Sequence, residues 1–165
     1  MMIGHYSRRV NPAPNLTPIA SLIGTWTGPG RGEYPTIDPF DYTETITIED
    51  IGKPFLVYRQ RTRSAAGVPL HTESGFLRLP ADGVVEFTLA QPTGHTELCE
   101  GVLEVGDGVV ALRMSGVVTG TATAKSVEAT ERRYRLDGDS LRTDFAMAAV
   151  GVPMTHHLTS ELGRV

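Results

Sequence analysis

From Gly24 to the C-terminus, apolar and polar side chains alternate with a period of two, and turn signals interrupt the alternation at regular intervals. In DYTETITIED (41–50), the threonines fall on one face of an extended chain and the residues at 42, 44, 46 and 48 fall on the other. Glycine turns such as PADG (80–83) and DGD (137–139) fit tight hairpins between such runs. Period-two runs joined by hairpins predict half-buried antiparallel strands.

The alternating runs predict an all-β fold of ten strands. Their ranges are 24–34, 40–50, 54–63, 68–79, 84–91, 94–105, 109–116, 125–136, 140–150 and 153–163. Only the stretch at 117–126 is loose enough for a longer loop. An open sheet of this size would leave exposed edges, so we predict an up-and-down barrel that closes on itself and can hold one small ligand. A two-sheet sandwich is the alternative, and the meander order with short hairpins favours the barrel.

The N-terminal region has a different pattern. Residues 1–15 contain no apolar core of signal-peptide length and are predicted to be a disordered lead-in, followed by a single domain over 16–165. NLTPIASLIG (15–24) predicts one short helical turn that Gly24 ends. Trp26 then falls early in the first strand, where a large aromatic side chain would plug the closed end of a barrel.

Composition and charge exclude several classes of protein. The formal net charge is −4 with no block of like charge, so we expect no nucleic-acid partner. No run approaches the roughly 18 apolar residues of a membrane span, so we expect no membrane partner and a cytoplasmic location. The single cysteine, Cys99, is expected to be buried and inert. The arginines of the most basic segments are predicted to lie on solvated strand faces; they are Arg59, Arg61, Arg63, Arg132, Arg133 and Arg135.

The stretch GTWTGPGRGEYPTI (24–37) raises the question of a phosphate-binding loop. Such a loop needs a strand, a glycine turn and a helix N-terminus, usually followed by Lys and Ser or Thr. Here neither that Lys-Ser/Thr pair nor a helical pattern follows. Glycine inside a strand instead marks a bend, a bulge or a close approach of backbone or ligand. We therefore interpret Gly24, Gly28, Gly30 and Gly32 as features of a bent first strand.

Histidine is the candidate ligating residue. His71 and His95 are predicted to be surface or rim residues. His156 and His157 lie on the predicted last strand, and because adjacent strand residues point to opposite faces, only one can face the barrel interior. The pair lacks the spacing of a zinc site, whereas one inward histidine would suit a single axial bond to a haem iron. The alternative is that each histidine is an ordinary core or surface residue with its hydrogen bonds made, and that neither binds iron.

The motif GTWTGPGRGEYPTI resembles the G-x-W-x-G-x-G-x-G-x-Y-P-T-I signature of the nitrobindin family of haem-binding β-barrels. The resemblance continues through IGKPFLVYRQRTR, PLHTESGFLRL, the TAKSVEATERRYRLDGDSL region and HLTSELGR, and covers nearly all of residues 16–164. It implies a ten-stranded antiparallel up-and-down barrel, lipocalin-like or fatty-acid-binding-protein-like, with one haem b per chain near its mouth. It also implies an isomerase: the ferric form would convert peroxynitrite to nitrate, and the iron would also bind nitric oxide.

The resemblance also implies site residues. Its C-terminal pattern places the axial ligand immediately before a leucine, which selects His157 as the metal-binding and catalytic residue, acting through the iron of a five-coordinate haem. Thr36 and Lys125 match positions credited with haem contacts, and Lys125 could pair with a propionate. The alternation of apolar and polar residues favours His156 as the inward histidine instead, because His156 shares its face with the more apolar residues Met154, Leu158 and Leu162.

Two other functions remain open. One is a nitric oxide sensor or carrier without physiological turnover. The other is a haem-free carrier of a fatty acid or another apolar ligand, which would normally keep an internal arginine and tyrosine for the carboxylate. Arg113, Arg135 and Tyr134 could serve there, although nothing singles them out. A homodimer is also compatible with the sequence.

Overall fold

The computed structural model describes residues 12–165 and contains one short 3₁₀ helix and ten strands. The elements are η1 (Pro14–Leu22), β1 (Gly24–Tyr34), β2 (Ile37–Asp50), β3 (Leu56–Arg63), β4 (Pro69–Ala81), β5 (Val84–Gln91), β6 (His95–Gly106), β7 (Val109–Gly120), β8 (Val127–Asp137), β9 (Ser140–Ala149) and β10 (Val152–Arg164).

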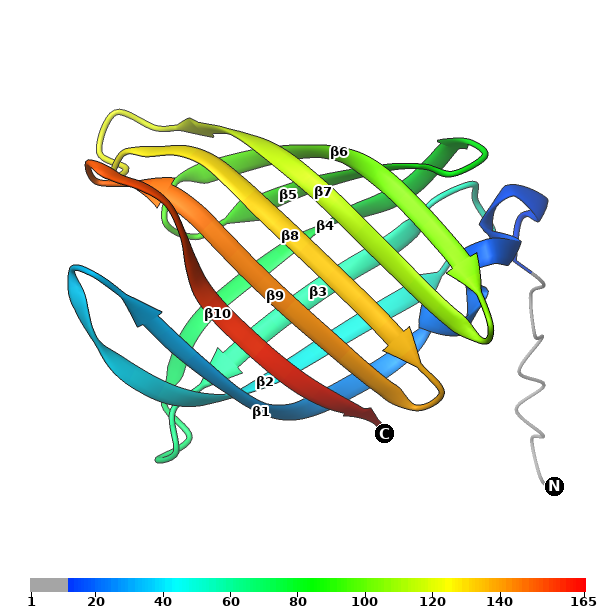
Figure 1. Cartoon of the computed structure of the whole chain (residues 1–165), viewed down its shortest axis with the longest axis horizontal. Helices are drawn as coiled ribbons and strands as arrows, with labels where there is room; N and C mark the ends of the chain where they lie inside the picture. The colour runs from blue at the N-terminus through cyan, green and yellow to red at the C-terminus, as the bar shows by residue number, and fades with distance from the viewer. Residues whose placement is uncertain (1–11) are drawn as a thin grey trace, which may run out of the picture.

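The ten strands form one closed antiparallel barrel (Figure 1). Each strand pairs with the next along the chain, and β10 returns to pair with β1, with Trp26 opposite Arg164 and Gly30 opposite Ser160. The barrel prediction is therefore confirmed, and the sandwich is excluded because the two edge strands pair with each other. This closure brings residues near 30 beside residues near 160, so the first and last strands build one wall together.

The predicted strand ranges agree with the observed bounds, and β1 and β5 match at both ends. The largest difference is in β7, which continues to Gly120 and shortens the predicted loop to 121–126. Most of the predicted lead-in lies outside the described residues, and its last two residues, Pro14 and Asn15, belong to η1. No helix within residues 12–165 has the length and apolar character needed to cross a membrane.

The η1 end of the barrel is closed by an apolar core. Leu16, Ile19 and Leu22 of η1 are buried there in one cluster with Trp26, which is fully buried. The indole Nε1 of Trp26 donates a hydrogen bond to the carbonyl oxygen of Leu22 at 2.9 Å, so the aromatic ring is tied to the helix that covers it. The guanidinium of Arg164 stacks 4.0 Å from the centre of the same ring. We call this the closed end.

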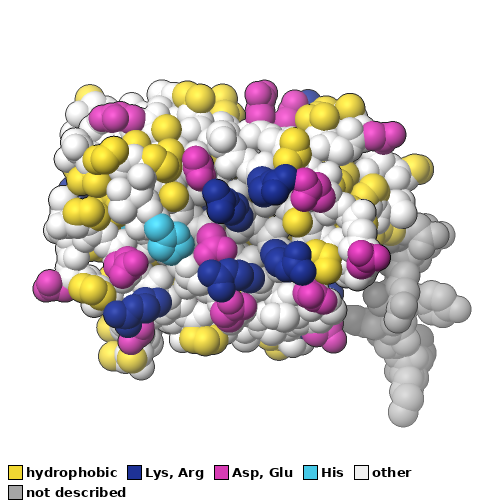
Figure 2. Space-filling view, in the orientation of Figure 1, with side chains coloured by type: hydrophobic (Ala, Val, Ile, Leu, Met, Phe, Trp, Pro, Cys, Tyr) yellow, Lys and Arg dark blue, Asp and Glu magenta, His cyan; other side chains and the backbone are white. Residues whose placement is uncertain are grey.

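The outer face over β8–β10 carries charges of both signs side by side (Figure 2). Arg142, for example, pairs with Asp144 at 2.9 Å and with Glu161 at 2.6 Å. Five of the six basic positions are exposed as predicted. The prediction is wrong for Arg132, which is 5% exposed, because it alternates with Arg133 and Arg135 on β8 and so faces the interior.

Candidate functional site

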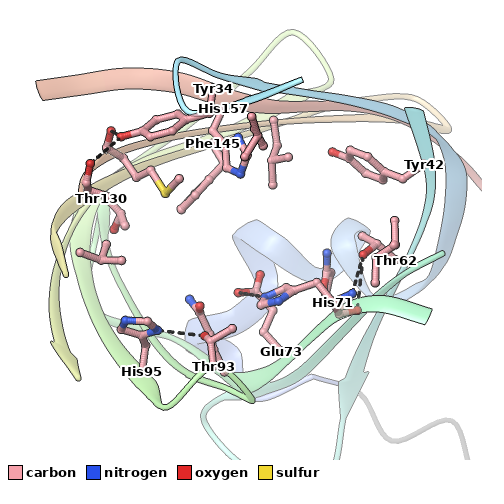
Figure 3. Close-up of a pocket in the computed structure, with 18 of the residues that line it drawn as sticks. Tyr34, Tyr42, Thr62, His71, Glu73, Thr93, His95, Thr130, Phe145 and His157 are labelled. Atoms are coloured by element: carbon pink, nitrogen blue, oxygen red, sulfur yellow. Dashed lines mark hydrogen bonds and ion pairs between the residues drawn. The ribbon is translucent and has the colours of Figure 1, made fainter. Parts of the chain in front are cut away.

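A cavity of about 880 Å³ occupies the end of the barrel opposite η1 (Figure 3). We call this the open end, because residues from the five hairpins β1–β2, β3–β4, β5–β6, β7–β8 and β9–β10 surround it. The volume lies within the range of roughly 300–1,000 Å³ that holds small molecules and cofactors. One wall, from β1, β2, β9 and β10, is largely apolar and includes Tyr34, Phe40, Phe145, Met147 and Leu158. The opposite wall and the floor carry most of the polar side chains.

His157 lies on the apolar wall, and a β-bulge explains its position. In the pairing of β10 with β9, His156 lies opposite Ala146 and Leu158 lies opposite Phe145, so His157 is an extra residue. The bulge breaks the alternation: Leu158 and His157 both line the cavity, whereas His156 is exposed and is not part of the lining. Strict period two, which turns His156 inward, therefore fails at this point of β10.

The hydrogen bonds of His157 define its tautomer. Nδ1 lies 2.9 Å from the carbonyl oxygen of Glu33. Since a carbonyl only accepts, Nδ1 carries the hydrogen and Nε2 keeps the lone pair. The ring packs edge-on against Tyr34 at 5.3 Å and lies 6.2 Å from Phe145, centre to centre. Burial lowers the pKa of His157, so the imidazole is neutral and able to ligate a metal.

The other two predicted cofactor contacts also line the cavity. Thr36 lies in the β1–β2 turn and Lys125 in the β7–β8 loop, and both are exposed at the open end. His95 holds the Lys125 segment in place, because its Nε2 donates to the Lys125 carbonyl oxygen at 2.8 Å. Its Nδ1 accepts from the Thr93 hydroxyl at 2.9 Å, so both ring nitrogens of His95 are occupied. Thr36, Lys125 and His157 thus come from three separate segments to one cavity.

The glycines of the first motif make room for β2 and β10 rather than for a phosphate. A Cβ on Gly30 would lie 2.3 Å from the Tyr42 ring and 2.6 Å from the Ser160 hydroxyl. A Cβ on Gly28 would lie 2.1 Å from the Glu161 carbonyl oxygen. The glycines therefore allow the Tyr42 ring to lie across β1, and Tyr42 reaches Ser160 of β10 with a hydrogen bond of 3.0 Å. Gly24, the first residue of β1, has a positive φ of 140°.

A buried ionic cluster joins β4, β6 and β8, and we call it the Arg132 cluster: Arg132, Glu73 and Glu97. Arg132 donates to both oxygens of Glu73, at 2.8 and 2.9 Å, and its Nε and Nη2 donate to Glu97 at 3.0 and 2.7 Å. Glu97 also accepts from the hydroxyl of Thr130 and from the Cys99 thiol. The guanidinium stacks 4.7 Å from the centre of the Phe145 ring, so the cluster touches the wall that carries His157.

The two carboxyl groups of the Arg132 cluster are held in their charged forms by Arg132. Burial alone would raise the pKa of Glu73, but the Arg132 charge, the nearby His71 ring and the hydrogen bonds from Arg132 outweigh it and lower that pKa to about 2. Glu97 is lowered in pKa for the same reason. Burial raises the pKa of Cys99 above its usual range, so the buried thiol is inert as expected.

A second buried carboxyl group, Glu44, behaves in the opposite way. No cation over residues 12–165 pairs with it, and it accepts hydrogen bonds from Gln60 at 2.8 Å and from Thr143 at 3.3 Å. Burial raises the pKa of Glu44, although these hydrogen bonds oppose the shift. The nitrogen of the Gln60 amide makes the bond to Glu44, whereas its oxygen is buried without a hydrogen-bond partner within the described residues. The floor therefore combines fixed charges with a carboxyl group that favours its neutral form.

Sequence reasoning missed this polar floor. Glu44, Glu73, Glu97 and Arg132 all fall on inward positions of alternating strands, so alternation alone places them inside. The missing information was the pairing, because Arg132 lies 59 residues from Glu73 and 35 from Glu97 along the chain. The internal arginine considered for a fatty-acid site was also wrong: Arg113 and Arg135 are exposed, and the inward arginine is Arg132.

Fold and site together define a closed β-barrel with a cavity of ligand size at its open end. The chain belongs to the family described as the THAP4-like, heme-binding beta-barrel domain, whose family model matches residues 15–164. The sequence resemblance to haem-binding barrels is therefore confirmed at the level of the family.

Individual relatives agree with this assignment. A protein named peroxynitrite isomerase 2 from Mycobacterium avium is 50% identical over 153 residues, which cover 92% of this chain and 95% of that protein. A peroxynitrite isomerase from Nocardia farcinica is 48% identical, over 92% of this chain and 91% of that protein. The crystal structure of Rv2717c from M. tuberculosis superposes with a TM-score of 0.92 at 44% identity, covering 94% of this chain and 99% of the other.

Proposed function

We propose that this chain binds one haem b in the open-end cavity through Nε2 of His157 and isomerises peroxynitrite to nitrate at the ferric iron. The observation that carries the proposal is the bulge in β10, which turns a neutral histidine onto an apolar wall of the cavity. Nε2 of this histidine has no hydrogen-bond partner in the part of the chain that the structure describes. Relatives at about 50% identity that are named peroxynitrite isomerase support the choice of reaction.

The residues present fit a haem. The cavity has the volume and the largely apolar wall that a flat porphyrin needs, and His157 supplies a nitrogen ligand of the kind that haem iron takes. Glu33 fixes the tautomer through its carbonyl oxygen, and such an outer hydrogen bond orients a ligating imidazole. Lys125 at the mouth would pair with a propionate, and Thr36 would hydrogen-bond to one or line the site.

A bound haem supplies the iron chemistry, and the protein supplies position and environment. His157 would hold the iron from one side, and the rings of Tyr34 and Phe145 hold His157 in place. Peroxynitrite and nitrate contain the same atoms and the same charge, so the conversion consumes no proton and needs no second substrate. The reaction therefore calls for no Ser-His-Asp triad or paired carboxylates.

The haem-free carrier of a fatty acid is less well supported. A fatty-acid carboxylate needs an available cation inside the barrel, and the inward Arg132 already gives its donors to Glu73 and Glu97. The two cluster carboxylates outnumber the one guanidinium and add negative potential around the same space. A nitric oxide carrier uses the same haem site, and the ferric isomerisation assay separates it from the isomerase.

The axial ligand is tested by replacing each histidine of the pair and recording the Soret band of the haem-loaded protein. We expect H157A to lose the histidine-ligated Soret band and H156A to keep it, because only His157 lines the cavity. The exposed His156 is thus a matched control on the same strand. Loss of the band in H156A but not in H157A would contradict the assignment.

The reaction is tested by stopped-flow decay of peroxynitrite with the purified ferric protein and by the nitrate formed. We expect faster decay in proportion to the haem-loaded protein, and a higher nitrate yield than from spontaneous decay. Equal decay rates of peroxynitrite with and without stoichiometric protein would contradict the isomerase proposal. Nitric oxide binding combined with equal decay rates would favour the carrier.

A further inference from the structure

His71 is the one histidine of the cavity lining that neither the axial position nor the wall structure accounts for. It lies on β4, across the cavity from His157 (Figure 3), and its side chain is 32% exposed. Its backbone is fixed by Thr62, whose hydroxyl accepts from the His71 N–H at 3.0 Å and donates to the His71 carbonyl oxygen at 3.4 Å. His71 is therefore held at one place facing the ligand space.

The imidazole of His71 lies beside the Arg132 cluster. Its Nε2 lies 4.0 Å from Oε2 of Glu73, an oxygen that Arg132 also binds. Glu73 cannot move toward the ligand, because the bidentate contact with Arg132 fixes both of its oxygens. The second ring nitrogen of His71 has no protein partner among the described residues and is left for a ligand.

Charge counting favours a cationic partner at this position. The Arg132 cluster holds two buried carboxylates against one guanidinium, so it carries one uncompensated negative charge. Buried charges are costly unless they are paired, and the His71 imidazole lies beside this one, 4.0 Å from Oε2 of Glu73. His95 cannot balance this charge, because both of its ring nitrogens are occupied.

We propose that His71, positioned by Glu73, donates a hydrogen bond to the small ligand that is bound in the cavity opposite His157. The inference rests on the proposed function, because it takes His157 as the axial ligand. An imidazole N–H facing the ligand stabilises an oxyanion with a hydrogen bond that the anion's charge strengthens, while its proton stays on the ring. His71 would thus contact the substrate, and Glu73, held by Arg132, would act as a positioning residue for the His71 ring.

The test uses the haem-reconstituted full chain, reduced and saturated with carbon monoxide, and measures the C–O stretching frequency by infrared spectroscopy. A positive hydrogen-bond donor near the oxygen draws electron density into the C–O antibonding orbital and lowers this frequency. We expect H71L to shift the band to higher frequency and H71Q, which keeps a donor, to lie between H71L and wild type. We expect E73Q to shift the band in the same direction as H71L, because His71 loses the carboxylate that orients it.

A second measurement uses azide, an anionic probe, with the ferric protein. Loss of a charge-assisted hydrogen bond should weaken azide binding by about tenfold or more in H71L. The control is H156L, which removes an exposed histidine and should change neither the C–O band nor the azide affinity. Circular dichroism confirms that each variant is folded, and H71Q provides the comparison should H71L unfold.

The outcomes separate the two proposals. A wild-type protein that never develops a histidine-ligated Soret band overturns the proposed function and this inference with it. A normal Soret band combined with an unchanged C–O frequency and unchanged azide affinity in H71L overturns the role of His71 alone. A shift in H71L without one in E73Q overturns the positioning role of Glu73 and leaves His71 as the donor.

Discussion

The two ends of this barrel are built from different chemistry. The closed end is an apolar core in which η1 covers the strands and Trp26 is fully buried. The open end keeps its interior space, and its buried side chains include three carboxyl groups and an arginine. Apolar burial stabilises a structure without specifying direction, whereas a buried charge is tolerated only in one arrangement of partners.

The two ends of the barrel differ in how tightly their interiors are packed. Packing at the closed end leaves little space, since the fully buried side chains there interlock. At the open end, the polar floor is held by hydrogen bonds, so the cavity can stay open without collapse of the walls. We therefore expect closed-end substitutions to act on stability and open-end substitutions to act on both stability and ligand binding.

The largest effect is expected from Trp26. W26A removes the largest buried side chain of the closed end together with its hydrogen bond to Leu22, and should lower the free energy of unfolding by about 5 kcal/mol. Urea unfolding measures this value, with V105A on the exposed outer face of β6 as the control. A loss below about 1 kcal/mol would mean that η1 does not stabilise the closed end through Trp26.

A somewhat smaller loss is expected from Arg132. R132M keeps much of the side-chain length but leaves Glu73 and Glu97 buried without a cation, which should cost about 3–4 kcal/mol. R133M, one residue later on β8, removes an exposed arginine whose contact with Glu131 spans 3.5 Å, and should change stability by no more than about 0.5 kcal/mol. Equal melting curves for the two variants would show that the cluster is not a stabilising element.

The closed end and the strand order could be predicted from the sequence, because both depend on local signals. Alternation and hairpin turns identified all ten strands, and the position of Trp26 at the start of β1 indicated the plugged end. Local signals are sufficient for the strand order because each strand of an up-and-down barrel pairs with its neighbour in sequence.

The open end could be predicted only in part, for two physical reasons. A β-bulge leaves no mark in the alternation, so period two chose His156, and the resemblance was needed to select His157. The partners of Arg132 come from β4 and β6, and no residue near Arg132 in the sequence indicates them. An arginine at an inward position is itself a signal, since it predicts that carboxylates from other strands face it.

A third prediction concerns Gly30, where the wall of the cavity depends on close packing of β1, β2 and β10. In G30A the new methyl group would meet the Tyr42 ring and the Ser160 hydroxyl, so we expect a loss of about 1–3 kcal/mol and a displaced Tyr42. G163A is the matched control on β10, because a Cβ there meets nothing within 4 Å. Thermal unfolding of the two variants decides, and equal stability would mean that β1 tolerates a side chain beneath Tyr42.

The smallest effect is expected from Glu44 and depends on pH. Since the pKa of Glu44 is raised in the folded state by burial, its contribution to stability is fully present below the unfolded pKa and is lost as pH rises through the folded pKa. E44Q cannot ionise and retains an oxygen that accepts from Gln60, so it should gain stability relative to wild type as pH rises from 4 to 8. Unfolding curves at several pH values measure this difference. A difference that stays constant, or that falls with pH, would show that Glu44 is ionised at no cost and that the floor of the cavity is better solvated than its burial indicates.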